Sequence, residues 1–152
     1  MNVDKLTLRV QQSLNEAQLT AVRLNHQQVD VLHLFSALLT DQDGLIPNIL
    51  GKMGVNLKGM REAIRHALEK LPRVYGEGAQ NSSVYATRRI EETFIKAEKA
   101  ADGFKDSYIS TEHVMLALME IDSNGAIGSI LKQFGITKEG FLSALNLVRG
   151  NQ

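Results

Sequence analysis

The chain has 152 residues, of which 43% are hydrophobic and 22% are charged, and it contains no cysteine. This composition excludes a disordered chain, a disulfide framework and a cysteine nucleophile, and the length suffices to bury a core. Lysine plus arginine and aspartate plus glutamate both number 17. Because the charges balance, the sequence does not predict a nucleic-acid partner or binding to an anionic membrane surface. No apolar run approaches the roughly 20 residues of a membrane span.

The hydrophobic period at the start of the chain is helical. Apolar residues recur in steps of four and three, which predicts one long amphipathic helix: Leu6, Val10, Leu14, Ala17, Ala21 and Leu24. Asp30 is a favourable N-cap for a second helix, which is apolar almost all round and hence buried. A short third helix carries Pro47 near its start, and a fourth helix begins after Asn56 and closes near Pro72.

Residues 72–82 are rich in turn formers and poor in apolar pattern, which predicts a linker. A second set of four helices follows it. Its first helix is expected from about Ser83 to Ala101, stopping near Gly103, and its second and fourth helices are expected after Ser110 and Thr137. Few stretches alternate with period two, so we expect no sheet.

The second set of helices repeats the first. A shift of 80 places Val29–Leu39 on Ile109–Met119, with His33 on His113, and carries the apolar stripe of the first helix onto that of the fifth. Beyond one added residue, a shift of 81 continues the match with the glycine pairs Gly44 and Gly125, Gly54 and Gly135, Gly59 and Gly140. Three glycines and several apolar stripes in one register indicate a duplicated unit.

We therefore predict an all-α fold of two four-helix repeats packed with pseudo-twofold symmetry into one eight-helix domain. The first repeat spans 1–71 and the second spans 83–149, and 150–152 would begin a further linker. Neither repeat is expected to fold alone, because a unit of about 70 residues buries little surface by itself.

The sequence contains no pattern typical of a catalytic centre. A P-loop, a H-E-x-x-H pair and a G-x-S-x-G turn are all absent, so we predict no catalytic residue and no cofactor. His33 and His113 could be metal ligands or proton-transfer groups, or structural histidines that satisfy a neighbouring loop carbonyl. Because a residue kept in both halves more often serves the shared fold, we favour the structural role and predict no metal site.

Two further pairs of residues have alternative interpretations. Leu14 and Phe94 hold matching positions on stripes that should meet near the pseudo-twofold axis, where they form either a sealed seam or the floor of an open groove. Asp106 and Glu112 flank the start of the second repeat's second helix, where they either interact favourably with the helix N-terminus or bind a ligand.

Several segments of the chain are similar to the Clp N-terminal repeat domain, the paired four-helix module at the head of Clp-family AAA+ unfoldases. The strongest similarity lies in Ala97-Glu-Lys-Ala100 and in Asp106–Met119. Leu71–Gly76 and Val148–Gln152 resemble the disaggregase branch of that family. Ala86-Thr-Arg-Arg89 departs from the protease-partnered branch, which typically has Pro-Arg at the start of this helix.

The resemblance implies a non-catalytic head that is tethered to ATPase rings, hexameric in the full-length protein, and that acts in the stress response. Such a head would weakly engage unfolded or aggregated polypeptide and deliver it to the ring, with cooperation from an Hsp70-type chaperone through the parent. We expect a cytoplasmic location and no nucleic-acid or membrane partner. The alternative is an adaptor-docking N-terminal domain of a protease-associated Clp unfoldase.

The resemblance also implies roles for particular residues. It implicates three polar residues, Thr7, Asp106 and Glu112, in substrate handling. It also implies an apolar groove whose walls are the first and fifth helices. On this basis we expect Phe94 to line an open groove rather than a sealed seam. The six predicted substrate-binding residues are Thr7, Leu14, Phe94, Asp106, Ile109 and Glu112.

Overall fold

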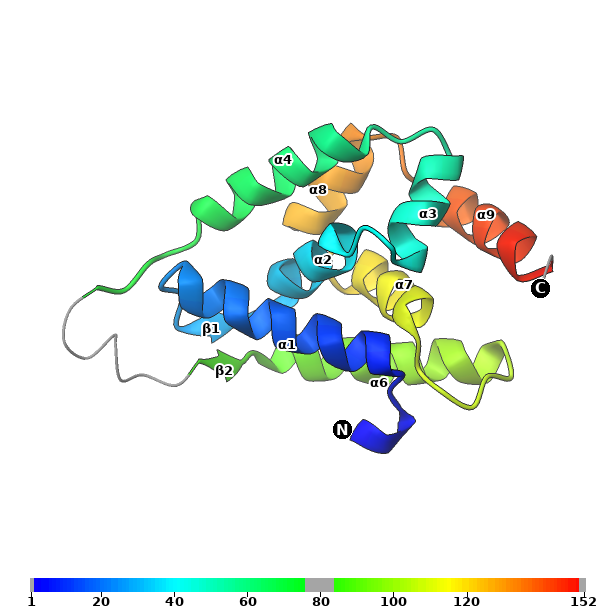
Figure 1. Ribbon diagram of the computed structural model, residues 1–152, viewed down its shortest axis with the longest axis horizontal. Helices are drawn as coiled ribbons and strands as arrows, with labels where there is room; N and C mark the ends of the chain where they lie inside the picture. The colour runs from blue at the N-terminus through cyan, green and yellow to red at the C-terminus, as the bar shows by residue number, and fades with distance from the viewer. Residues whose placement is uncertain (1, 76–83, 151–152) are drawn as a thin grey trace.

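The computed structural model describes residues 2–75 and 84–150 (Figure 1). Eight α-helices and one 3-10 helix lie in these ranges, which confirms the all-α fold class. The elements are η1 (Val3–Lys5), α1 (Leu8–Arg23), β1 (Gln28–Val29), α2 (Val31–Thr40), α3 (Leu45–Lys52), α4 (Leu57–Glu69), β2 (Tyr85–Ala86), α6 (Arg88–Gly103), α7 (Thr111–Ile121), α8 (Ala126–Gln133) and α9 (Lys138–Gly150).

The helix boundaries follow the duplication in the sequence. α1 and α6 differ by 80 residues at both ends, and α3 and α8, like α4 and α9, differ by 81 at both ends. The turns repeat as well: Asn25 and Lys105 have φ angles of 59° and 60°, and Gly54 and Gly135 have φ angles of 79° and 70°. Left-handed backbone at Asn25 and Lys105 is uncommon for residues other than glycine, so the two repeats share even their less common geometry.

The expectation of no sheet is wrong on a small scale. β1 and β2 pair in parallel, with Val29 opposite Ala86, and a single bridge joins Leu6 to Ile109. A shift of 80 converts one pairing into the other, so the segment before the first helix of each repeat pairs with the loop before the second helix of the other repeat. Strands of two residues are too short for period-two alternation to appear in the sequence.

The start of α6 also differs from the prediction. Thr87 takes the N-cap position and α6 begins at Arg88, because the pairing of β2 with β1 holds the preceding residues extended. Residue 83, where this helix was expected to begin, lies outside the described residues. Most of the predicted linker, from 76 onwards, lies outside them too.

The core is shared by the two repeats. α2 and α7 cross at the centre, and Figure 1 shows α1 and α6 along one side of this pair and α4 and α8 along the other. The outer helices pack across the repeat boundary, since α4 contacts α8 and α3 contacts α9. Among the described helices, none is by itself long and apolar enough to cross a membrane. α7 and α8 together reach the necessary length and apolar character, but they are bent by 104° relative to each other.

Candidate functional site

A hollow of about 340 Å³ lies against α6, and the N-terminal Asn2 of the first repeat also borders it. We call it the Phe94 hollow, and its lining residues are Asn2, Glu91, Phe94, Ile95, Glu98 and Ile109. Four of them recur on α6 at the spacing i, i+3, i+4, i+7, which places them on one side of the helix. Two of the six predicted site residues, Phe94 and Ile109, therefore lie at the same hollow.

Phe94 lines this hollow from inside the core. Its side chain is only 4% exposed, because it continues the buried stripe of α6 that also includes Ile90 and Ala97. We expected the Phe94 side chain to be exposed in an open groove, and its burial shows that this expectation is wrong. The burial corresponds to the alternative of a sealed seam. The exposed apolar group at the hollow is Ile95, at 59%. Ile95 was not among the predicted residues, and its signal in the sequence is a large apolar residue beside the buried stripe.

Thr7 lies next to the Phe94 hollow through its backbone. Its N–H donates to the carbonyl of Ile109 at 3.0 Å, while its hydroxyl caps α1 by accepting from the N–H of Val10 at 3.3 Å. Leu14 is half-buried and packs against the core, but it does not line the Phe94 hollow. The structure thus joins Thr7, Phe94 and Ile109 and leaves Leu14 apart.

Asp106 and Glu112 meet at one guanidinium. Both carboxylate oxygens of Asp106 accept from Arg149, at 2.8 and 2.9 Å, and Glu112 accepts from the same side chain at 3.3 Å. The ring of Phe104 lies 4.7 Å from the guanidinium carbon, within range of a cation–π contact. We call this group the Arg149 cluster.

The Arg149 cluster fixes the loop that carries Ile109. Hydrogen bonds from Arg149 and then from His113 hold the pKa of Asp106 below its usual range, so the carboxylate is ionised at neutral pH. Within the described residues, Asp106 accepts from Arg149 and also contacts His113, whereas Glu112 accepts only from Arg149. The sequence prediction missed Arg149, although an arginine near the end of the last helix, where the first repeat has Leu68, was the available signal.

His113 has a structural role in this cluster. Its Nδ1 accepts from the N–H of Ser110 at 2.9 Å, and its Nε2 lies 2.8 Å from Asp106. The structural interpretation holds, but the ring satisfies a backbone N–H of the helix cap rather than a loop carbonyl. His33 occupies the same position in the first repeat and accepts from the N–H of Asp30, also at 2.9 Å.

The partner of His33 is another histidine. His33 Nε2 lies 2.8 Å from His26 Nδ1. Because the N–H of Asp30 occupies His33 Nδ1, the neutral ring carries its proton on Nε2 and donates it to His26. His26 then carries its proton on Nε2, and this buried atom has no hydrogen-bond partner within the described residues.

The environment of this pair disfavours an added proton. Burial, followed by the nearby His26 ring, lowers the pKa of His33 to about 4. Burial and the charge of Arg73 lower the pKa of His26. In the ranges 2–75 and 84–150, no group of three or more histidines and carboxylates is arranged to hold a metal ion.

Comparisons with known proteins agree with this architecture. The chain belongs to the Clp repeat (R) N-terminal domain family, whose model matches residues 5–134. It is 59% identical to the chaperone protein ClpB of Clostridium perfringens over all 152 residues. The chain therefore corresponds to the N-terminal domain of a ClpB-type chaperone, and it spans 18% of that relative's length.

Solved structures show the same fold. The Hsp104 N-terminal domain from Candida albicans matches with a TM-score of 0.81 and 22% identity, covering 97% of this chain and 93% of the other. A ClpV N-domain in complex with a VipB peptide matches with a TM-score of 0.74 and 14% identity, covering 96% of this chain and 88% of the other. At these identities the similarity establishes the fold alone.

Proposed function

We propose that this domain weakly binds unfolded or aggregated polypeptide and passes it to the ATPase ring of a ClpB-type disaggregase. The observation that carries the proposal is the Phe94 hollow, where exposed Ile95 adjoins a recess of about 340 Å³ that ends on Phe94 and Ile109. A recess of this size accepts one large apolar side chain, a feature that many unfolded sequences supply. Binding through so small a contact is weak, which allows release to a motor.

The remaining predicted residues would act by shaping this hollow. Thr7 holds the backbone of Ile109 directly, and Asp106 and Glu112 hold the same loop through Arg149. We assign all three a positioning role in substrate handling. Leu14 supports α1 from the core and has no direct role in this proposal.

The parent protein supplies the rest of the proposed function. We propose that the domain is non-catalytic and that it is tethered to hexameric ATPase rings in the cytoplasm. Cooperation with an Hsp70-type chaperone would occur through the parent. The family membership and the ClpB relatives support this assignment, and the balanced charge of the chain is consistent with a lack of nucleic-acid and membrane partners.

Substitution of Ile95 tests the proposal. We expect Ile95→Ser to weaken the binding of a permanently unfolded polypeptide by about three- to tenfold, since an exposed apolar contact contributes about 1 kcal/mol. The matched control is Val22→Ser, which removes a similarly exposed apolar residue, at 54%, from α1 and away from the hollow. Fluorescence anisotropy measures the affinities, and thermal melting checks that both variants remain folded.

Equal affinities for the wild type and a folded Ile95→Ser variant would contradict the proposal. Competition separates it from adaptor docking. A folded adaptor that binds without displacing the unfolded polypeptide, and whose affinity is unchanged by Ile95→Ser, would show that the domain docks folded partners on another surface.

A further inference from the structure

A second hollow, of about 390 Å³, lies between α6, α7 and α9. Its floor is apolar and includes Phe104, Leu116 and Leu142, of which Leu116 is buried and the other two are half-buried. The volume lies in the range of about 300–1,000 Å³ typical of ligand pockets. We call it the basic hollow, because of the side chains at its rim.

Three lysines and one glutamate form this rim. Glu120 lies 2.6 Å from the ammonium of Lys138 and 3.6 Å from that of Lys96, so two lysines share one carboxylate. Lys99 is exposed and forms no ion pair within the part of the chain that the structure describes. The hydrogen bond from Lys138, and then the charges of Lys138 and Lys96, lower the pKa of Glu120. The rim therefore retains an excess of two positive charges beside an apolar floor.

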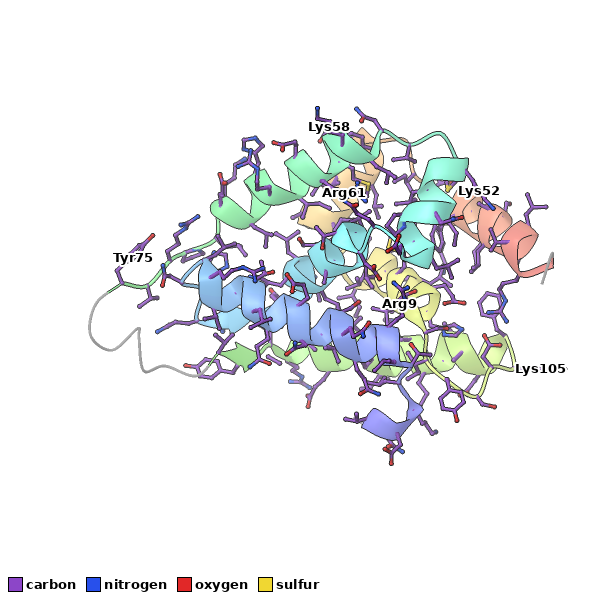
Figure 2. All side chains as sticks on the ribbon, in the orientation of Figure 1. Arg9, Lys52, Lys58, Arg61, Tyr75 and Lys105 are labelled. Atoms are coloured by element: carbon purple, nitrogen blue, oxygen red, sulfur yellow. The ribbon has the colours of Figure 1, made fainter. Side chains whose placement is uncertain are left out.

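The first repeat shows that the shared fold does not require this hollow. The floor residues Phe104, Leu116 and Leu142 correspond to Leu24, Ser36 and Arg61. Arg61, labelled on α4 in Figure 2, is tied to the carbonyl of Leu39 at 2.8 Å. Polar side chains thus take two of the three floor positions in the first repeat.

The rim differs between the repeats in the same way. Lys96, Lys99 and Lys138 correspond to Glu16, Leu19 and Leu57. The first repeat forms the same helices without any of these lysines. Helix packing therefore does not explain why the second repeat has them. An apolar floor and a basic rim occur together only in the second repeat.

We propose that the basic hollow binds a short polypeptide segment in which one large apolar side chain is flanked by aspartate or glutamate. The apolar side chain would enter between Phe104, Leu116 and Leu142, and the flanking carboxylates would pair with Lys96 and Lys99. Charge complementarity selects this partner over a basic segment. The inference rests on the proposed function, because it names a class of client segment and gives it a surface separate from the Phe94 hollow.

Peptide titration followed by NMR tests the inference. The probe is the capped peptide Gly-Asp-Leu-Phe-Glu-Gly, and the comparison peptide has lysine in place of both acidic residues. With the isotope-labelled domain, we expect the acidic peptide to shift the amide signals of Gly103, Leu116 and Leu142. Binding should weaken as salt increases, because the rim charges are exposed and screened.

A charge-matched pair of variants sharpens the test. Lys99→Glu should weaken binding of the acidic peptide by about three- to fivefold, which is typical of an exposed charge at an interface. Lys58→Glu makes the same charge change at an exposed position on α4 (Figure 2), so it should leave the affinity unchanged. Equal effects of the two variants would show that only net charge matters and would overturn the inference.

The peptide outcomes separate this inference from the proposed function. Shifts at Ile95 and Ile109 instead of the three amides, or equal binding of the lysine peptide, would overturn the basic hollow as the site. Absence of binding by the acidic peptide would also overturn it. If unfolded polypeptide still bound in an Ile95-dependent way, the proposed function would stand without this inference.

Discussion

The two repeats solve the same packing problem with different chemistry at one position. In both, a histidine in the first turn of the second helix accepts the N–H of the helix cap, and its other ring nitrogen meets the residue seven positions earlier. That residue is His26 in the first repeat and Asp106 in the second. Two further positions are apolar in the first repeat and charged in the second: Leu32 corresponds to Glu112, and Leu68 corresponds to Arg149.

This difference shows which interactions the fold requires. The bond between the cap N–H and the histidine occurs in both repeats, so it belongs to the shared architecture. The partner of the second ring nitrogen is free to change. An ionised Asp106 can accept a proton-bearing nitrogen in either charge state of its histidine, whereas the His26–His33 contact holds a single shared proton. The repeats should therefore respond differently to substitution and to acid.

The largest expected effect compares Phe94 with Leu14, which hold equivalent positions. Phe94→Ala should lower the free energy of unfolding by about 3–5 kcal/mol, because it removes a buried ring from the core. Leu14→Ala should lower it by less than half of that, since Leu14 is half-buried. Urea denaturation measures both values. Similar losses would show that the two positions are equivalent in energy despite their different burial.

Acid should destabilise the whole domain through His33 of the first repeat, by slightly less than Phe94→Ala does. The folded-state pKa of His33 is about 4, below the unfolded value of about 6.5, so the unfolded chain binds more protons between these values. Stability is therefore lost as pH falls from about 6.5 towards 4. A difference of about 2.5 pKa units corresponds to about 3 kcal/mol. Urea denaturation at a series of pH values measures this loss.

Exchange of the His33 partner should remove this sensitivity. His26→Asp gives the first repeat the carboxylate that Asp106 supplies in the second, and it eliminates the unpartnered His26 Nε2. The variant should show a much smaller loss of stability between pH 6.5 and pH 4. An unchanged acid response in the folded variant would mean that the His26–His33 pair is not its source.

The smallest of these effects concerns the Arg149 cluster. Arg149→Leu introduces the residue of the first repeat, and it leaves Asp106 partly and Glu112 almost fully buried without their cation. We expect a loss of about 1–2 kcal/mol, between the values for exposed and buried ion pairs. Thermal melting with Glu112→Leu added is the control: the second substitution should restore part of the loss, and no restoration would contradict a charge-based cause.

The helices and their caps were predictable because local patterns determine them. The periodicity of α1 and the N-caps Asp30, Asn56 and Thr137 lie where the sequence places them. The paired segments at Val29 and Ala86 were not predictable, because a two-residue strand forms only when the other repeat is in place. The pairing of Arg149 with Asp106 depends likewise on a contact across 43 residues.

The candidate site was predictable only in part. Phe94 and Ile109 follow from the apolar pattern and meet at one hollow. Phe94 and Ile95 are adjacent on α6, and the depth at which the helix packs into the core determines which of them is exposed. The sequence does not give this depth, so Ile95 was missed. A stripe of apolar residues shows which side of a helix faces inward, but it does not show how far the neighbouring side chains are covered.

α6 borders both hollows, and this arrangement has a consequence for avidity. Four residues of α6 line each hollow, and both sets have the spacing i, i+3, i+4, i+7. The first set starts at Glu91 and the second at Lys96. This offset of five positions corresponds to roughly 140° around the helix. Glu91 and Glu98 border the Phe94 hollow, whereas three lysines and one glutamate border the basic hollow. An extended segment of about four to six residues is long enough to cross the helix between them. On our proposals, a client with opposite charges at its two ends would be held by two weak contacts at high effective concentration, and a pull on either end would release them one at a time.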